Sequence, residues 1–141
     1  MTKVLKATNN IKAYFLRHGF KAYLGEIANT LVDKQKYVGG YIEVISIDGV
    51  IDLICNEDGK LLHLPVNRAF VDDDGEVLDV IVGDILVVRH NEEGDFVDVH
   101  ENDLETIIKH LRPCQIIGER GGYTVVRIMP EKELEIWKDE K

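Results

Sequence analysis

The sequence predicts an α+β fold: a single antiparallel sheet, formed as a meander of hairpins, with two or three helices packed on it. Two observations support this prediction. Apolar residues recur at helical spacing in three short stretches, whereas from Tyr41 onward they mostly follow the period of two that strands show. Turn signals rich in Asp, Asn and Gly then separate the apolar runs. With 141 residues, the chain is expected to form one domain, 1–141.

Three helices are expected, at residues 9–18, 30–38 and 102–111. The first carries Ile11, Tyr14 and Phe15 on one face. Gly19 follows it and can adopt the left-handed conformation that ends many helices. The third also has an apolar stripe, and Pro113 blocks its continuation.

Strands are expected over residues 21–27, 41–47, 50–55, 60–64, 85–90, 95–99, 114–117 and 123–129. Asp48-Gly49 is the strongest short hairpin signal in the chain, and its hairpin is expected at the centre of the sheet. Pro65 is expected to end the strand before it, because proline has no amide hydrogen to donate. Residues 77–82 are apolar but fit either a strand or one turn of helix.

Charge is distributed unevenly along the chain, whose net charge is −9. Residues 1–47 hold seven Lys or Arg against three Asp or Glu (+4), residues 48–105 three against seventeen (−14), and residues 106–141 seven against six (+1). The acidic middle repels a phosphate backbone, so direct DNA binding is not expected. The acidic block fits either a solvated face that keeps the protein soluble or a surface shaped for a basic partner.

The composition predicts a cytoplasmic protein that does not enter the membrane. The N-terminal residues lack the apolar core of a signal peptide, and the run from Ile85 to Val88 is far too short to span a membrane. The two cysteines, Cys55 and Cys114, do not make a disulfide framework and are expected to be reduced thiols.

Known motifs for metal sites and nucleophilic catalysis do not fit this sequence. The acidic turns at Gly59 and Gly75 place apolar residues where a calcium loop needs its first and last ligands. The histidines show no zinc spacing, and Cys55 lies in an apolar strand where burial makes a thiol inert. No catalytic residue, metal ligand or cofactor is therefore predicted.

The candidate ligand-binding residues are Arg68, Asn67 and Asn56. Asn67-Arg68 follows a proline, so both side chains are expected on an irregular segment near a sheet edge. The planar fork of Arg donors suits a phosphate or carboxylate, and Asn can pair with an adenine-like edge. The alternative is that Arg68 pairs with a neighbouring acid, Asp72 or Asp79, and only fixes the loop.

Four motifs occur in order between residues 31 and 88: Val38-Gly39-Gly40-Tyr41-Ile42-Glu43, Ile54-Cys55-Asn56-Glu57-x-Gly59-Lys60, Leu64-Pro65-x-Asn67-Arg68-Ala69 and Asp79-Val80-Ile81-x-Gly83. In sequence and spacing they resemble the family called domain of unknown function 3846, small proteins common in bacteriophages, plasmids and conjugative elements. The resemblance covers residues 21–105, and residues 1–20 and 113–141 look like additions. It implies an accessory protein of a mobile element, in the cytoplasm of the host cell, and such proteins often counter host defence. It supplies no catalytic residue.

Three functions stay open at this point. The first is a non-catalytic protein that binds a small anionic or nucleotide-type ligand, such as a nucleotide signal used by host immunity. The second is an acidic inhibitor that imitates nucleic acid and occupies a host defence protein. The third is an enzyme that acts on a nucleotide. A homo-oligomer is compatible with each of them.

Overall fold

The computed structural model describes residues 9–130, which form ten strands and two helices. The helices are α1 (Leu31–Val38) and α2 (Asp103–His110). The strands are β1 (Asn10–Leu16), β2 (Tyr23–Ala28), β3 (Ile42–Ser46), β4 (Ile51–Asn56), β5 (Val66–Val71), β6 (Val77–Val82), β7 (Ile85–His90), β8 (Phe96–Val97), β9 (Leu111–Arg120) and β10 (Tyr123–Ile128). No helix within residues 9–130 is long and apolar enough to cross a membrane.

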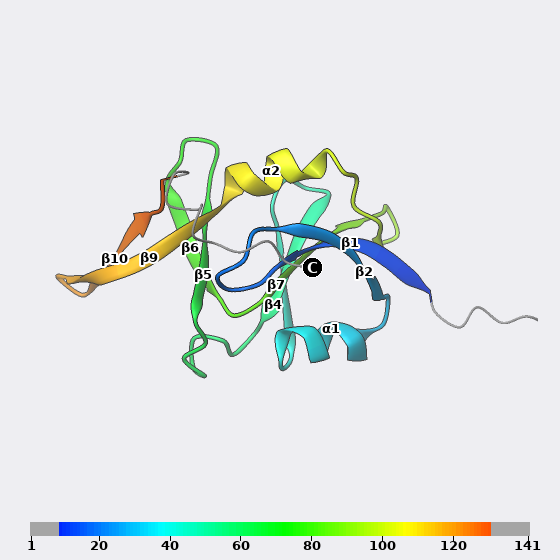
Figure 1. Ribbon diagram of the computed structural model, residues 1–141, viewed down its shortest axis with the longest axis horizontal. Helices are drawn as coiled ribbons and strands as arrows, with labels where there is room; N and C mark the ends of the chain where they lie inside the picture. Colours follow the sequence, from blue (N-terminus) through cyan, green and yellow to red (C-terminus); the bar gives the residue numbers. More distant parts are fainter. Residues whose placement is uncertain (1–8, 131–141) are drawn as a thin grey trace, which may run out of the picture.

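The strands form two antiparallel sheets, not the single sheet that was predicted (Figure 1). The larger sheet has the order β2-β1-β7-β4-β3, with the short β8 paired to the end of β7. The smaller sheet has the order β10-β9-β5-β6. Helix α1 packs on one face of the larger sheet, and α2 lies on the other face, toward the smaller sheet (Figure 1). The α+β class is thus confirmed, but the strands do not form one meander.

The hairpin at Asp48-Gly49 forms as predicted but lies at an edge. It joins β3 to β4, with Gly49 at φ 97° and Asp48 Oδ1 accepting the Ile51 amide at 3.0 Å. However, β3 is the last strand of the larger sheet, and β7 is its middle strand. Turn chemistry determines which strands pair locally, but only long-range pairing determines where the hairpin sits in a sheet.

The helix predicted over residues 9–18 is wrong, because this segment is strand β1. Its partners are β2 and β7, so both of its edges are hydrogen-bonded. Both of its faces are also covered: Ala13 and Leu16 are at most 1% exposed, and Tyr14 and Phe15 are buried as well. A strand buried on both faces has no alternation of apolar and polar residues, and the helical spacing seen in the sequence was coincidental.

The other two predicted helices are confirmed as α1 and α2. The Thr30 side chain accepts the Asp33 amide at 3.1 Å and so caps the start of α1. Gly39, at φ 81°, ends this helix and donates its amide to Gln35 at 2.8 Å. Both caps are local, because a cap depends on residues close together in sequence.

The strand predicted over residues 60–64 is also wrong, because this segment forms turns. The strand begins after Pro65 instead, as β5, and the Pro65 carbonyl accepts the Gly83 amide at 2.7 Å. Proline precedes the strand here and does not end one. Residues 77–82, ambiguous in sequence, form strand β6.

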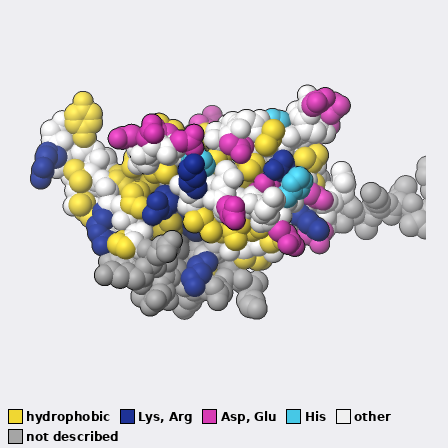
Figure 2. Space-filling view, turned by 90° about the horizontal axis from the view of Figure 1, so that it is seen from above, with side chains coloured by type: hydrophobic (Ala, Val, Ile, Leu, Met, Phe, Trp, Pro, Cys, Tyr) yellow, Lys and Arg dark blue, Asp and Glu magenta, His cyan; other side chains and the backbone are white. Residues whose placement is uncertain are grey.

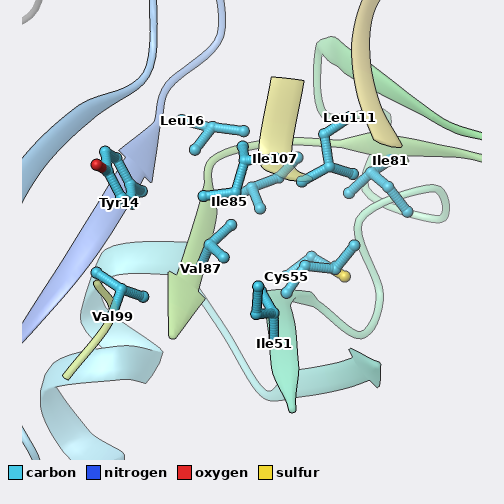
Figure 3. Close-up of a cluster of buried hydrophobic side chains, with 11 residues drawn as sticks. Tyr14, Leu16, Ile51, Cys55, Ile81, Ile85, Val87, Val99, Ile107 and Leu111 are labelled. Atoms are coloured by element: carbon cyan, nitrogen blue, oxygen red, sulfur yellow. The ribbon is translucent and has the colours of Figure 1, made fainter. Parts of the chain in front are cut away.

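The main core lies between the larger sheet, α2 and the smaller sheet (Figure 3). Strands β1, β4 and β7 of the larger sheet contribute side chains that include Leu16, Leu53 and Ile85. Helix α2 adds Ile107, and β6 adds Ile81 from the smaller sheet. This shared core binds the two sheets into one unit, because its apolar surface is removed from water only when both are in place.

Both cysteines are buried free thiols, as predicted. Burial raises the pKa of Cys55 to about 12 and that of Cys114 to about 11. Because only the thiolate reacts, we expect folded protein at pH 8 to resist iodoacetamide, and protein unfolded in urea to be alkylated on both thiols. Mass spectrometry counts the adducts; rapid alkylation of the folded chain would contradict the burial.

Candidate functional site

Asn67 and Arg68 lie in β5, which has a neighbour on each side in the smaller sheet. The expectation that they occupy an irregular segment near a sheet edge is therefore wrong. The two residues lie at a β-bulge. Val66 pairs with Val82 and Arg68 with Ile81, which leaves Asn67 as the extra residue. A bulge re-aims side chains that a regular strand would send to opposite faces.

Asn67 is fully buried and joins three parts of the chain. Its Nδ2 donates to the Leu16 carbonyl at 2.7 Å and to the Gly83 carbonyl at 2.8 Å. Its Oδ1 accepts a hydrogen bond from Arg68 Nη1. The first carbonyl belongs to the end of β1 and the second to the β6–β7 turn. Asn67 thus connects the two sheets, and none of its side-chain atoms is accessible to a ligand.

Arg68 is only 3% exposed, yet it is one of the residues that line a cavity. Its Nη2 donates to the Phe20 carbonyl at 3.0 Å, and Nη1 donates to Asn67. Burial lowers the pKa of Arg68 to about 10, which leaves the group charged at neutral pH. The acids Asp72 and Asp79 are engaged elsewhere: the first accepts amides of its own turn, and the second pairs with Lys60.

Asn56, the third predicted residue, lies at the end of β4 and does not line the same cavity. Its Nδ2 donates to the Val38 carbonyl at 3.1 Å, and its Oδ1 accepts the Asp58 amide at 2.8 Å. Asn56 therefore holds the end of α1 and the turn after β4. The structure brings Asn67 and Arg68 together but gives Asn56 a separate, structural set of contacts.

The cavity beside Arg68, here called the α2 pocket, has a volume of about 470 Å³. It lies between the β1–β2 loop, strand β5, helix α2 and the start of β9. Its residues are Leu16, Lys21, Ala22, Arg68, Leu104, Ile107, Ile108, Lys109, Leu111, Arg112 and Pro113. Cavities of this size hold molecules as large as a nucleotide.

The α2 pocket combines apolar side chains with positive charge. Lys21, Arg68, Lys109 and Arg112 line it, and no acidic residue of the described part of the chain does. On the side of the molecule that carries α2, Lys and Arg side chains stand among hydrophobic ones (Figure 2). Lys109 also pairs with Asp73 at 3.2 Å, but both of these side chains are exposed, so this ion pair contributes little.

A second hollow, of about 690 Å³, lies beside the first turn of α1. Its lysine, Lys34, is buried and donates to Asn29 Oδ1 at 2.7 Å, with its ammonium 5.1 Å from the Phe96 ring centre. Burial lowers the pKa of Lys34. Asp95 and Asp98 also line this hollow. These two carboxylates oppose the binding of an anion in this hollow, so the α2 pocket is the better anion site.

One pair in the structure has the geometry of a general base: His90 Nδ1 lies 2.7 Å from Asp52 Oδ2, and Asp52 is buried. A carboxylate in this position orients an imidazole, as in catalytic triads. Neither residue lines the α2 pocket or the hollow beside α1. Within residues 9–130, no group of three His, Cys, Asp or Glu side chains could hold a metal ion.

Three cations of the α2 pocket were missed in the sequence: Lys21, Lys109 and Arg112. Lys109 and Arg112 were detectable in part, because they flank the end of a predicted helix, where cations favour the helix dipole. Lys21 had no signal of its own. It reaches the pocket only because β1 and β2 form a hairpin whose loop lies beside α2.

A family model for a domain of unknown function, DUF3846, matches residues 11–112. The chain belongs to this family. The DUF3846 match begins ten residues before the stretch over which the resemblance was drawn, and it includes all of β1 except Asn10. It also includes every residue of the α2 pocket except Pro113. No curated protein and no solved structure is significantly similar to the chain.

Proposed function

We propose that this DUF3846 protein binds a small anionic molecule of nucleotide type in the α2 pocket and does not transform it. One observation carries the proposal: among residues 9–130, four basic side chains and no acidic one line a cavity whose remaining walls are apolar. A chain with a net charge of −9 does not collect cations in one cavity by composition alone. Such a concentration favours an anionic ligand.

The two kinds of wall suit the two parts of a nucleotide. Leu104 and Ile108, half-buried and exposed respectively, offer apolar surface to the flat face of a base. Arg112 and Lys21 offer hydrogen-bond donors to phosphate oxygens, and charge-assisted bonds of this kind are the strong ones. Arg68 lies deeper and is fixed by its bonds to Phe20 and Asn67. A fixed donor loses little freedom on binding, which favours affinity.

The surrounding charge favours a small ligand over a nucleic acid. Three of the four cations come from outside the acidic block: Lys21 precedes it, and Lys109 and Arg112 follow it. Residues 48–105 still carry −14, which repels a long phosphate backbone. A molecule small enough to enter the pocket meets the cations and contacts little of that acidic surface.

The biological role follows from the family resemblance and is part of the proposal. A mobile element gains if an accessory protein removes a nucleotide signal that host defence needs. Binding without turnover is enough for this purpose, because the signal acts only while it is free. His90 and Asp52, the pair with the geometry of a general base, do not line the α2 pocket, which supports a binder over an enzyme.

We expect Arg112→Gln to weaken binding at least tenfold, because it removes a charge-assisted hydrogen bond worth about 1.5–3 kcal/mol. Calorimetry with pyrophosphate, AMP and a cyclic nucleotide measures the affinity. Native mass spectrometry of freshly purified protein shows which molecule, if any, it retains. Lys36→Gln is the matched control: it removes the same charge from α1, which packs on the opposite face of the larger sheet.

Arg68 variants are a less direct test, because Arg68 also holds Phe20 and Asn67. Its replacement would change stability and binding together. If Arg112→Gln and Lys36→Gln bind the probes equally well, or if the unchanged protein binds none of them, the proposal is wrong.

A further inference from the structure

The chain itself carries a segment suited to the α2 pocket. The described part ends at Pro130, and Met129 just before it is buried and donates its amide to the Pro113 carbonyl at 2.9 Å. Pro113 lines the pocket. The described chain therefore ends close to the pocket. An extended chain of eleven residues reaches about 36 Å, far more than is needed to enter it.

The composition of residues 131–141, Glu-Lys-Glu-Leu-Glu-Ile-Trp-Lys-Asp-Glu-Lys, complements the pocket. It has five acids, three lysines and three large apolar residues. At 133–136 acidic and apolar residues alternate, so four residues offer both carboxylates and aliphatic groups. The pocket presents the counterparts, namely Arg and Lys side chains beside Leu104 and Ile108.

We infer that residues 131–141 bind in the α2 pocket of their own chain and compete with the ligand there; this inference rests on the proposed function. Carboxylates of the segment take the place of phosphate on the cations, and its apolar side chains cover Ile108. Ile108 is 54% exposed, so it has apolar surface available to cover.

Tethering makes this competition effective even if each contact is weak. A segment joined to the pocket by a few residues acts at an effective concentration in the millimolar range. The apparent affinity for an external ligand is the intrinsic affinity multiplied by the fraction of pockets that the segment leaves open, so it falls as that fraction falls. The segment would thus set a threshold: the protein takes up a ligand only when its concentration or charge is high enough to displace the carboxylates.

Trp137 gives a direct test, because it is the only tryptophan of the chain. In the full chain we expect its fluorescence to be blue-shifted and protected from acrylamide, relative to a synthetic peptide of residues 131–141. Arg112→Glu and Ile108→Asn should each shift the emission toward that of the peptide and raise quenching severalfold. Lys36→Glu, on α1, should leave both unchanged. Circular dichroism checks that the variants are folded.

A variant of the segment tests the competition without altering the pocket. Glu133→Lys combined with Glu135→Lys should expose Trp137 and raise the apparent affinity for pyrophosphate severalfold. Equal quenching of Trp137 in the full chain and the peptide would overturn the inference. So would protection that the Arg112 and Ile108 variants leave intact, or protection that disappears on dilution, since the segment would then bind elsewhere or to another copy.

The two proposals fail separately. Protection of Trp137 without binding of any probe contradicts the proposed function but not the docking of the segment. Binding of pyrophosphate without any change in Trp137 quenching contradicts competition by the segment and leaves the proposed function in place.

Discussion

Replacing Asn67 with alanine should lower the free energy of unfolding by about 3 kcal/mol or more. The substitution leaves the Leu16 and Gly83 carbonyls and one Arg68 donor without their partner in the protein interior. Each buried polar group left unsatisfied costs about 1–3 kcal/mol. Urea unfolding measures the change, and the midpoint should fall while the slope stays the same.

Two further variants separate this cause from others. Asn67→Asp keeps the size of the side chain and the acceptor for Arg68 but loses the two donors, so we expect it to be strongly destabilising as well. Asn10→Ala removes an exposed asparagine from β1 and should cost well under 1 kcal/mol. Stability of Asn67→Ala within experimental error of the unchanged protein would show that water satisfies these groups.

Replacing Arg89 with alanine should cost about 3 kcal/mol at neutral pH. Arg89 Nε and Nη2 each lie 2.7 Å from a different oxygen of Asp103, and the Asp103 side chain is only 5% exposed. Removing the guanidinium leaves a buried carboxylate without its ion-pair partner, which is among the costlier single changes. Thermal or urea unfolding at pH 7 measures it.

The pH dependence of this loss of stability shows whether the ionised Asp103 carboxylate causes it. The Arg89 hydrogen bonds lower the pKa of Asp103 in the folded protein. A lowered folded-state pKa means that the stabilisation is fully present above the unfolded-state value, roughly 3.9, and is lost as pH falls through the folded-state value. The difference in stability between the unchanged protein and Arg89→Ala should therefore shrink as pH drops from 5 toward 3.

The pair of Lys60 with Asp79 supplies the matched control. It is also an ion pair between basic and acidic side chains, but both are exposed, so Lys60→Ala should cost less than about 1 kcal/mol. A difference between the unchanged protein and Arg89→Ala that stays constant from pH 7 to pH 3 would contradict the role assigned to Asp103.

Local features of the fold were predictable, and features that depend on distant partners were not. The β3–β4 hairpin and helix α1 follow from Asp48-Gly49, Thr30 and Gly39, which act on residues next to them. Strand β1 has no such local signal, because its two faces are covered by cores that include Val38 of α1 and Ile107 of α2. One of its edges pairs with β7, about seventy residues away. The division into two sheets likewise depends on β5 pairing with β9, more than forty residues away.

The residues of the α2 pocket depend on distant partners in the same way. Of the three candidate residues, only Arg68 lines this pocket. Its expected neighbour Asn56 serves another part of the fold, whereas Lys21, Lys109 and Arg112 come from three elements that only the tertiary structure assembles. No spacing in a single sequence encodes such an assembly.

The bulge at Asn67 fixes the number of residues at the start of β5. In a regular strand, successive side chains face opposite ways, so losing a paired residue turns the residues after it to the other face. Losing the extra residue, Asn67, would keep Arg68 opposite Ile81 but would remove the side chain that bonds the Leu16 and Gly83 carbonyls and Arg68. The turns on either side, at residues 57–64 and 72–76, carry no such constraint. Insertions and deletions among DUF3846 proteins are therefore expected to accumulate in those turns, and the chain length between Pro65 and Arg68 to be kept.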